Sequence, residues 1–236
     1  METHSTRIEI QGVVKRYHYH PVLNHLSMTI EDGSLCVLVG ANGAGKTTLL
    51  RILAALVRPD KGQIRLGGMA IANDPHLRRK LGYIGHQPMF YQDLSAIENL
   101  LHYARLYQLS TPIEKVREGI FSVGLSSYQH KPVRSFSRGM QQRLSIARAL
   151  LHDPAILLFD EPYTGLDQEA AQFLDGRLRE LHQPGRTILV AAHRPQRLIP
   201  IASHIAWLKD GHITQHIPVS GLIENPELEG YLQEAV

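Results

Sequence analysis

Continuous runs of apolar residues mark three segments of the chain as buried strands. The runs are Leu35–Val39, Ala155–Phe159 and Thr187–Ala192. Strands of a parallel sheet are covered on both faces, so they read as unbroken apolar runs. Between the last two runs, Gln168–His182 has the spacing of an amphipathic helix. A strand, a helix and a second strand in this order predict a βαβ crossover in a parallel sheet.

Alternating apolar and polar positions predict an antiparallel arrangement near the start of the chain. Arg7–Val14 alternates, and Leu26–Ile30 is suited to pair with it. Four more short strands are expected, the last two of them flanking an Asp-Gly hairpin turn: Gln63–Leu66, Lys80–Ile84, His204–Leu208 and His212–Ile217. A short amphipathic tail, Gly221–Val236, follows this hairpin.

Helical periodicity replaces the strand pattern over residues 88–151. Ser95 and Glu98 form a capping-box pattern, and Thr111 and Glu114 form another with Pro112 at the first helical position. A third helix begins near Ser137. We therefore expect one domain over residues 1–236, with a helical subdomain at 88–151. Residues 1–87 and 152–236 are expected to build the sheet core and the antiparallel β-subdomain.

A glycine-rich loop joins the first apolar run to the helix expected at Lys46–Val57. Its sequence is Gly-x-x-x-x-Gly-Lys-Thr, the phosphate-binding pattern, between a strand and a helix as that pattern requires. Glycines let the backbone amides converge on an anion, and the helix N-terminus adds a positive dipole. We expect these residues to bind a nucleoside triphosphate: Gly40, Asn42, Gly43, Ala44, Gly45, Lys46, Thr47 and Thr48. Lys46 would contact the outer phosphates, and the Thr47 hydroxyl would ligate Mg²⁺.

Polar residues follow the other strands at the edge where ligands bind in open α/β sheets. Asp160 ends one apolar run and is placed to hold Mg²⁺, while Glu161 is placed to polarise an attacking water. His193 closes the strand Thr187–Ala192 and is a candidate to contact a phosphate or to orient the base. Gln87 lies before Pro88, at the entry to the helical stretch, and is a candidate sensor of the Mg²⁺ site.

Ser137 and Gly139 open a helix and suggest a second phosphate-binding position. A hydroxyl, a bare glycine amide and a helix dipole can converge on one anion, and the alternative is a simple N-cap by Ser137. If the helical stretch is a separate lobe, this phosphate is not the one that Lys46 holds. The nucleotide of a partner subunit would then be its natural occupant.

Composition limits the surroundings of the protein. The chain has 236 residues, 43% hydrophobic and 20% charged, with a net charge of +3, which gives no strong argument for nucleic acid. Its single cysteine, Cys36, cannot form an internal disulfide, which fits a reducing compartment. No apolar run is long enough to span a bilayer, and Met1–Arg7 lacks the core of a signal peptide. We expect a cytoplasmic protein whose membrane role, if any, comes through a partner.

Together these motifs resemble the ATP-binding cassette family over nearly the whole chain. Gly40–Thr48 matches the Walker A motif, Ile156–Asp160 the Walker B motif with Glu161 in the catalytic position, and Phe136–Met140 the signature motif. The remaining matches are Gln87 with the Q-loop, Gly165–Asp167 with the D-loop, His193 with the switch histidine and Tyr17 with the aromatic residue that stacks on adenine. In the signature, Arg138 replaces a glycine and Met140 a glutamine.

The resemblance implies an α/β P-loop NTPase fold, with a RecA-like core, an N-terminal antiparallel β-subdomain and an inserted α-helical subdomain. It implies Mg²⁺-dependent ATP hydrolysis by a homodimer or heterodimer of ATPase subunits. ATP would lie between Lys46 of one subunit and Ser137 of the other, with Gly139 and Asp167 also near it. An integral membrane permease would be driven from the cytoplasmic face, and no nucleic acid partner is expected.

Short segments resemble one subfamily more closely. Ile84–Pro88 and Leu94–Leu100 look like the ATPase subunit of the heme exporter of cytochrome c maturation, the CcmA-like proteins. Two alternatives stay open. One is the ATPase of another exporter, for a drug, lipid or polysaccharide, and the other is a soluble cassette ATPase that acts on nucleic acid or ribosomes.

Overall fold

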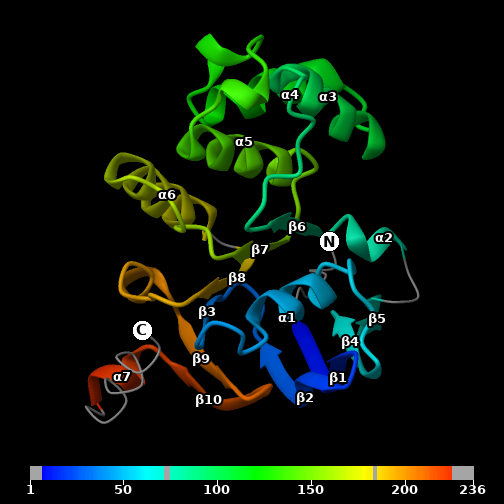
Figure 1. Cartoon of the computed structure of the whole chain (residues 1–236), viewed down its shortest axis with the longest axis vertical. Coiled ribbons are helices and arrows are strands. Elements are labelled where there is room, and N and C mark those ends of the chain that lie inside the picture. The colour runs from blue at the N-terminus through cyan, green and yellow to red at the C-terminus, as the bar shows by residue number, and fades with distance from the viewer. Residues whose placement is uncertain (1–6, 72–74, 183–184, 225–236) are drawn as a thin grey trace.

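The computed structural model describes residues 7–71, 75–182 and 185–224. Within these residues the strands form two sheets, a four-stranded sheet of order β2-β1-β4-β5 and a six-stranded sheet of order β10-β9-β3-β8-β7-β6. Figure 1 shows both sheets at one end of the molecule and a group of helices at the other. The predicted tail at Gly221–Val236 begins inside a short helix, but its residues 225–236 lie outside the described residues, as do residues 1–6.

The six-stranded sheet contains all the predicted apolar runs, and its central strands are parallel. Its strands are β3 (Leu35–Val39), β6 (Leu81–Ile84), β7 (Ile156–Asp160), β8 (Thr187–Ala192), β9 (His204–Lys209) and β10 (His212–Pro218). β3 pairs in parallel with both β8 and β9, while β7 pairs in parallel with β6 and β8. β10 closes one edge as the antiparallel partner of β9. The carboxyl ends of β3, β7 and β8 therefore meet at one edge of the sheet.

The antiparallel β-subdomain packs beside this sheet. It consists of β1 (Ile8–Tyr17), β2 (His20–Ile30), β4 (Lys61–Leu66) and β5 (Met69–Ala70), and all its pairings are antiparallel. β1 and β2 are longer than the alternation in the sequence indicates. They meet at a tight turn in which His18 has a φ of 56°.

The helices are separated into two groups. α1 (Lys46–Leu53), α2 (Pro75–Arg78), α6 (Gln168–Leu181) and α7 (Ser220–Glu224) accompany the sheets. α3 (Ala96–Leu106), α4 (Pro112–Ser122) and α5 (Arg138–Leu150) pack together at the far end (Figure 1). Short 3₁₀ turns occur at Ser126–Tyr128, Val133–Ser135 and Ile199–Ile201. We propose residues 88–151 as the limits of the helical subdomain.

Two of the expected local features differ from the structure. The first helix ends at Leu53 rather than near Val57, because Ala55 takes a left-handed φ of 56°. Ser95 forms the predicted capping box with Glu98, but Thr111 makes no side-chain cap. The capping residues of α3, α5 and α6 have extended backbones with ψ of 163° to 175°, whereas Thr111 has a ψ of 68°, outside the extended conformation typical of an N-cap.

Two apolar clusters cover the two faces of the parallel sheet. One joins the sheet to the helical group, and the other joins it to α1 and the antiparallel sheet. Cys36 lies in the second cluster, where burial raises the pKa of its thiol to about 12. No helix within the described residues has the length and hydrophobicity needed to span a bilayer. The sheet is thus covered by apolar packing on both faces.

Candidate functional site

The phosphate loop runs from the end of β3 to the first turn of α1, and two of its glycines are sterically required. Gly45, the N-cap of α1, has a φ of 108°, and a Cβ there would lie 2.8 Å from the Val22 carbonyl oxygen. A Cβ on Gly40 would lie 2.4 Å from the carbonyl oxygen of Leu208. Because real Cβ atoms do not approach oxygen so closely, the neighbouring backbones fix glycine at both positions.

Lys46 is the first residue of α1 and is only 5% exposed. Its ammonium donates to the carbonyl oxygens of Gly40 at 2.6 Å and Ala41 at 3.2 Å. It also lies 3.2 Å from Oε1 of Glu161, which follows β7. A cation in this place, with glycine amides around it, is suited to bind the outer phosphates of a nucleotide.

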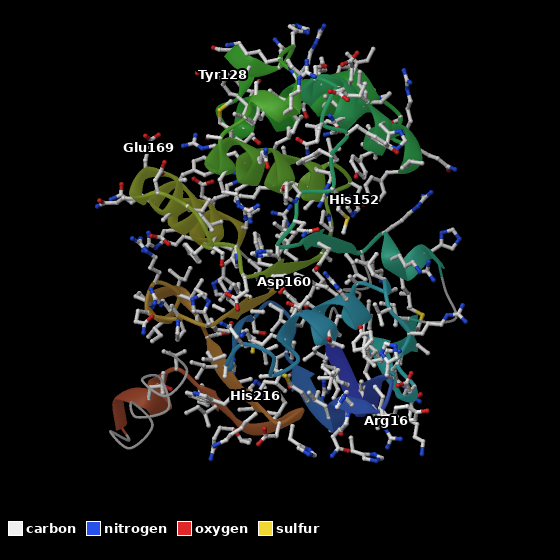
Figure 2. All side chains as sticks on the ribbon, viewed as in Figure 1. Arg16, Tyr128, His152, Asp160, Glu169 and His216 are labelled. Atoms are coloured by element: carbon white, nitrogen blue, oxygen red, sulfur yellow. The ribbon has the colours of Figure 1, made fainter. Side chains whose placement is uncertain are left out.

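Asp160 is almost fully buried and is held by residues from two neighbouring elements. The Thr47 hydroxyl of α1 donates to its Oδ1 at 2.8 Å, and the Tyr83 hydroxyl of β6 donates to its Oδ2 at 3.2 Å. Figure 2 shows Asp160 in the middle of the molecule, where β7 ends. Burial, and next the charge of Asp160, raise the pKa of Tyr83 to about 12, so this phenol keeps its proton at neutral pH.

Glu161 and His193 form a second polar pair beside the first. Nδ1 of His193 lies 2.8 Å from Oε2 of Glu161, and the backbone amide of His193 donates to the same oxygen at 3.3 Å. Glu161 has a left-handed φ of 51°, which turns its side chain away from the line of β7. The carboxylate is therefore held between an imidazole on one oxygen and the Lys46 ammonium on the other.

One cavity borders the phosphate loop, and another lies where β7 and β8 end. The larger, of about 580 Å³, is lined by Pro21, Val22, Gly40–Ala44, Trp207–Gly211 and Thr214. The smaller, of about 310 Å³, is lined by Glu161–Gly165 and Ala192–Arg194. The first offers room next to the glycine amides, and the second opens onto the paired carboxylate and imidazole. Asn42 and Gly43 are exposed in the loop, while Thr48 is half-buried in α1.

Tyr17 and Gln87 stand apart from this arrangement. Tyr17 is 42% exposed at the end of β1 and does not line the larger cavity, although Pro21 and Val22 from the same hairpin do. Gln87 is exposed just beyond β6, and its side chain makes no hydrogen bond to Thr47 or Asp160 within the described structure. The roles expected for these two residues stay predictions.

Ser137, Gly139 and Asp167 lie where two helices begin, and neither cavity is lined by them. Ser137 caps α5 by accepting from the Met140 amide, and Asp167 caps α6 by accepting from the Ala170 amide. A Cβ on Gly139 would lie 2.9 Å from the Cβ of Ala170, so this glycine lets the two helix starts pack closely. All these contacts lie within one chain, so the binding of a partner's nucleotide stays a prediction.

Sequence reasoning missed the role of Tyr83. Its hydroxyl reaches Asp160 only because β6 is the parallel neighbour of β7, with Tyr83 opposite Leu158. The apolar runs predict which segments are strands but not which strands are adjacent. The order of strands in the sheet is therefore the information that would have identified this residue.

Comparison with known proteins gives the family. The family profile described as "ABC transporter" matches residues 23–164. The "ABC transporter ATP-binding protein NatA" of Bacillus subtilis is 34% identical over 208 residues, which are 86% of this chain and 85% of that protein. The "Bacitracin transport ATP-binding protein BcrA" of Bacillus licheniformis is 35% identical, covering 92% of this chain and 72% of its own length. Neither name refers to heme or to cytochrome c.

Solved structures agree with this assignment. A structure described as "ATP binding subunit of ABC transporter" superposes with a TM-score of 0.84 at 28% identity, covering 95% of each chain. The expected fold class, a RecA-like core with an antiparallel β-subdomain and an inserted helical subdomain, is confirmed. The chain belongs to the ABC transporter family, as an ATP-binding subunit whose ATP hydrolysis is coupled to transport.

Proposed function

We propose that this subunit binds ATP with Mg²⁺ at residues 40–48 and uses Glu161 to activate the attacking water. The observation that carries the proposal is the position of the Glu161 carboxylate. It lies between the ammonium of the phosphate-loop lysine, 3.2 Å away, and the imidazole of His193, 2.8 Å away. A carboxylate held beside the phosphate site by two partners is suited to accept a proton at its oxygen.

The residues at the end of β7 fit Mg²⁺. Hard oxygen donors are the ligands that this ion prefers, usually one or two carboxylates together with phosphates and waters. Oγ1 of Thr47 and Oδ1 of Asp160 are 2.8 Å apart, close enough to share one ion or its bound water. When bound, Mg²⁺ would neutralise charge on the outer phosphates. Gln87 is proposed to reach this position from its exposed loop, and so to report the state of the site to the helical subdomain.

Each residue around Glu161 has a separate proposed task. Lys46 holds the outer phosphates and so leaves Glu161 when a nucleotide enters. His193 keeps Oε2 of Glu161 occupied through its ring nitrogen and its amide, which directs Oε1 toward the substrate. Water attack then requires Oε1 to take one proton. Hydrolysis of this kind depends chiefly on positioning and on charge stabilisation.

We propose that two such subunits, identical or paralogous, enclose each ATP. Ser137 and Gly139 belong to the helical group and line neither the cavity at the phosphate loop nor the cavity at the ends of β7 and β8 of their own chain. They are suited to contact the nucleotide held by Lys46 of the partner subunit, with Asp167 near the same contact. Tyr17 is proposed to stack on the adenine ring. Closure on ATP and reopening after hydrolysis would then move an integral membrane permease.

Two kinds of resemblance bear on the transported substrate. The segments Ile84–Pro88 and Leu94–Leu100 support the heme-export subfamily of cytochrome c maturation. The name of the bacitracin-transport relative supports the alternative, an exporter of a drug, lipid or polysaccharide. We favour an export ATPase of this second kind, because the resemblance to BcrA covers 92% of the chain rather than two short segments.

Co-purification from membranes tests the proposal. The tagged chain is solubilised in mild detergent from its native host, and its partners are identified by mass spectrometry. If an integral membrane permease co-purifies and the complex has Mg²⁺-dependent ATPase activity, the chain is supported as a subunit bound to the cytoplasmic face of the membrane. A heme-handling membrane protein would select the heme-export function, and an unrelated permease would exclude it. Recovery of RNA or DNA without any permease would contradict the transport function.

A further inference from the structure

Arg138 departs from the signature motif and makes contacts that a glycine cannot make. It is the first residue of α5, and its guanidinium reaches two backbone carbonyls outside the helix. Nη2 donates to the carbonyl oxygen of His86 at 2.7 Å, and Nε lies 3.4 Å from that of Thr164. Both acceptors are carbonyls of loops, so the side chain joins segments rather than neutralising an acid.

The three joined segments all carry residues of the proposed site. His86 directly precedes Gln87 in the loop that leaves β6. Thr164 lies between Glu161 and Asp167, and its amide donates to the Glu161 carbonyl oxygen at 3.2 Å. α5 itself presents Ser137 and Gly139. One arginine side chain therefore connects the signature segment, the Gln87 loop and the loop that follows the catalytic carboxylate.

The surrounding packing keeps this arginine in place. A Cβ on Gly165 would lie 3.6 Å from Cγ of Arg138, so the aliphatic part of the arginine packs against the backbone of Gly165, whose φ is 74°. A second arginine of the same helix, Arg148, is buried and donates to the carbonyl oxygens of Tyr83 at 3.0 Å and Met89 at 3.4 Å. Thus α5 holds the segment around Gln87 by carbonyls on both sides of it.

We propose that Arg138 is a positioning residue that makes the signature segment, the Gln87 loop and the loop after Glu161 move as one unit. The inference rests on the proposed function, since it assigns a coupling role within that site. A planar guanidinium presents several donors in a fixed fork and can bridge two carbonyls, whereas a lysine ammonium is a point charge on a flexible stem. This difference separates a geometric connection from a role of the charge alone.

Hydrogen exchange on the nucleotide-free protein tests the connection without using activity. The amides of Tyr91, Thr164 and Leu166 are hydrogen-bonded in the two loops that Arg138 contacts. In Arg138→Gln we expect these amides to exchange about tenfold faster, as for loss of a charge-assisted hydrogen bond. Strands β3 and β8 should exchange as in the parent. The matched control is Arg134→Gln, which removes an exposed arginine paired with Asp93 in the helical group. Equal rates in Arg138→Gln and the parent would overturn the proposal.

Steady-state kinetics then separates geometry from charge. We expect both Arg138→Gln and Arg138→Lys to lower kcat about tenfold. KM for ATP should stay within about twofold of the parent's value, because Arg138 does not contact the phosphate loop of its own chain. Full recovery of kcat in Arg138→Lys would show that the charge, acting on a phosphate, is what matters, and would also overturn the proposal. If the parent itself hydrolyses no ATP, the proposed function fails, while the exchange measurement still decides the connection.

Discussion

The ammonium of Lys46 and the carboxylate of Glu161 lie 3.2 Å apart, so the phosphate-binding cation and the proposed base are partners in the nucleotide-free chain. Both side chains are largely buried, with exposures of 5% and 16%. An ion pair with little solvent around it is screened weakly. On the proposed function, an entering nucleotide would replace the Glu161 carboxylate as the anion beside Lys46, and this exchange would free Glu161 to act on water.

The first prediction follows from this pair. Glu161→Gln should hydrolyse ATP at least about tenfold more slowly, since it removes the proposed proton acceptor. It should bind ATP as tightly as the parent or more tightly, because Lys46 no longer has a competing carboxylate. Steady-state ATPase assays and fluorescent-nucleotide titration measure the two effects. Glu180→Gln, which changes an exposed glutamate of α6, is the control. Near-normal turnover in Glu161→Gln would remove Glu161 from the role.

A second prediction concerns the hydroxyl of Tyr83. Tyr83→Phe removes the hydroxyl that bonds to Oδ2 of Asp160 and to the Arg51 side chain, and keeps the ring. The carboxylate should then be less well oriented toward Mg²⁺, and the Mg²⁺ concentration for half-maximal ATPase activity should rise about fivefold, the ratio for one lost hydrogen bond. Tyr19→Phe is the matched control, since that ring is 97% exposed. An unchanged Mg²⁺ requirement would mean that Thr47 alone positions Asp160.

The pH dependence of unfolding gives a third prediction. Burial raises the pKa of Tyr83 from 10.0 to about 12, so the folded state retains a proton that the unfolded state loses in this range. The resulting stability is complete below pH 10.0 and is lost as the pH rises toward 12. Tyr83→Phe should therefore lose less stability over this window than the parent. Urea unfolding at several pH values measures the two slopes, and equal slopes would contradict the assignment.

Ser95 and Thr111 both precede a helix with a glutamate three residues later, yet their replacement by alanine should change the free energy of unfolding by different amounts. Ser95 forms a complete capping box with Glu98, so Ser95→Ala should lower the free energy of unfolding by about 1 kcal/mol. Thr111 makes no side-chain cap, so Thr111→Ala should change it by only a few tenths of that amount. Thermal or urea unfolding checks both variants together. A loss of the same size at Thr111 would mean that its hydroxyl caps α4 in solution.

The sequence predicts most of what depends on local pattern. β8 runs over the predicted Thr187–Ala192, and α5 begins directly after the predicted Ser137, because burial and capping leave periodic signals. Ala55 ends α1 early by taking a left-handed backbone conformation, and no glycine or proline at this position predicts that end. Its conformation is imposed by the neighbouring structure rather than by its own preference.

The residues of the proposed site also divide into those that local pattern predicts and those that only packing reveals. Asp160, Glu161 and His193 are predicted as site residues because they follow apolar strands in a chain that also carries the phosphate loop. Tyr83 becomes part of the site only through the adjacency of β6 and β7, and the contacts of Arg138 depend on how the helical group meets two loops. Contacts between segments distant in the chain are set by packing, which periodicity does not encode.

The buried thiol of Cys36 has a practical consequence for studying this protein in motion. Thiolates are the species that react with alkylating dyes, and a thiol with a pKa of about 12 in an apolar cluster supplies almost none at neutral pH. It is also the only cysteine of the chain. The natural sequence is therefore already a background in which an introduced surface cysteine would carry the label alone. Dyes attached to surface cysteines introduced on α5 and on an exposed position of the six-stranded sheet would follow the relative movement of the two parts during turnover. The buried Cys36 would not have to be replaced.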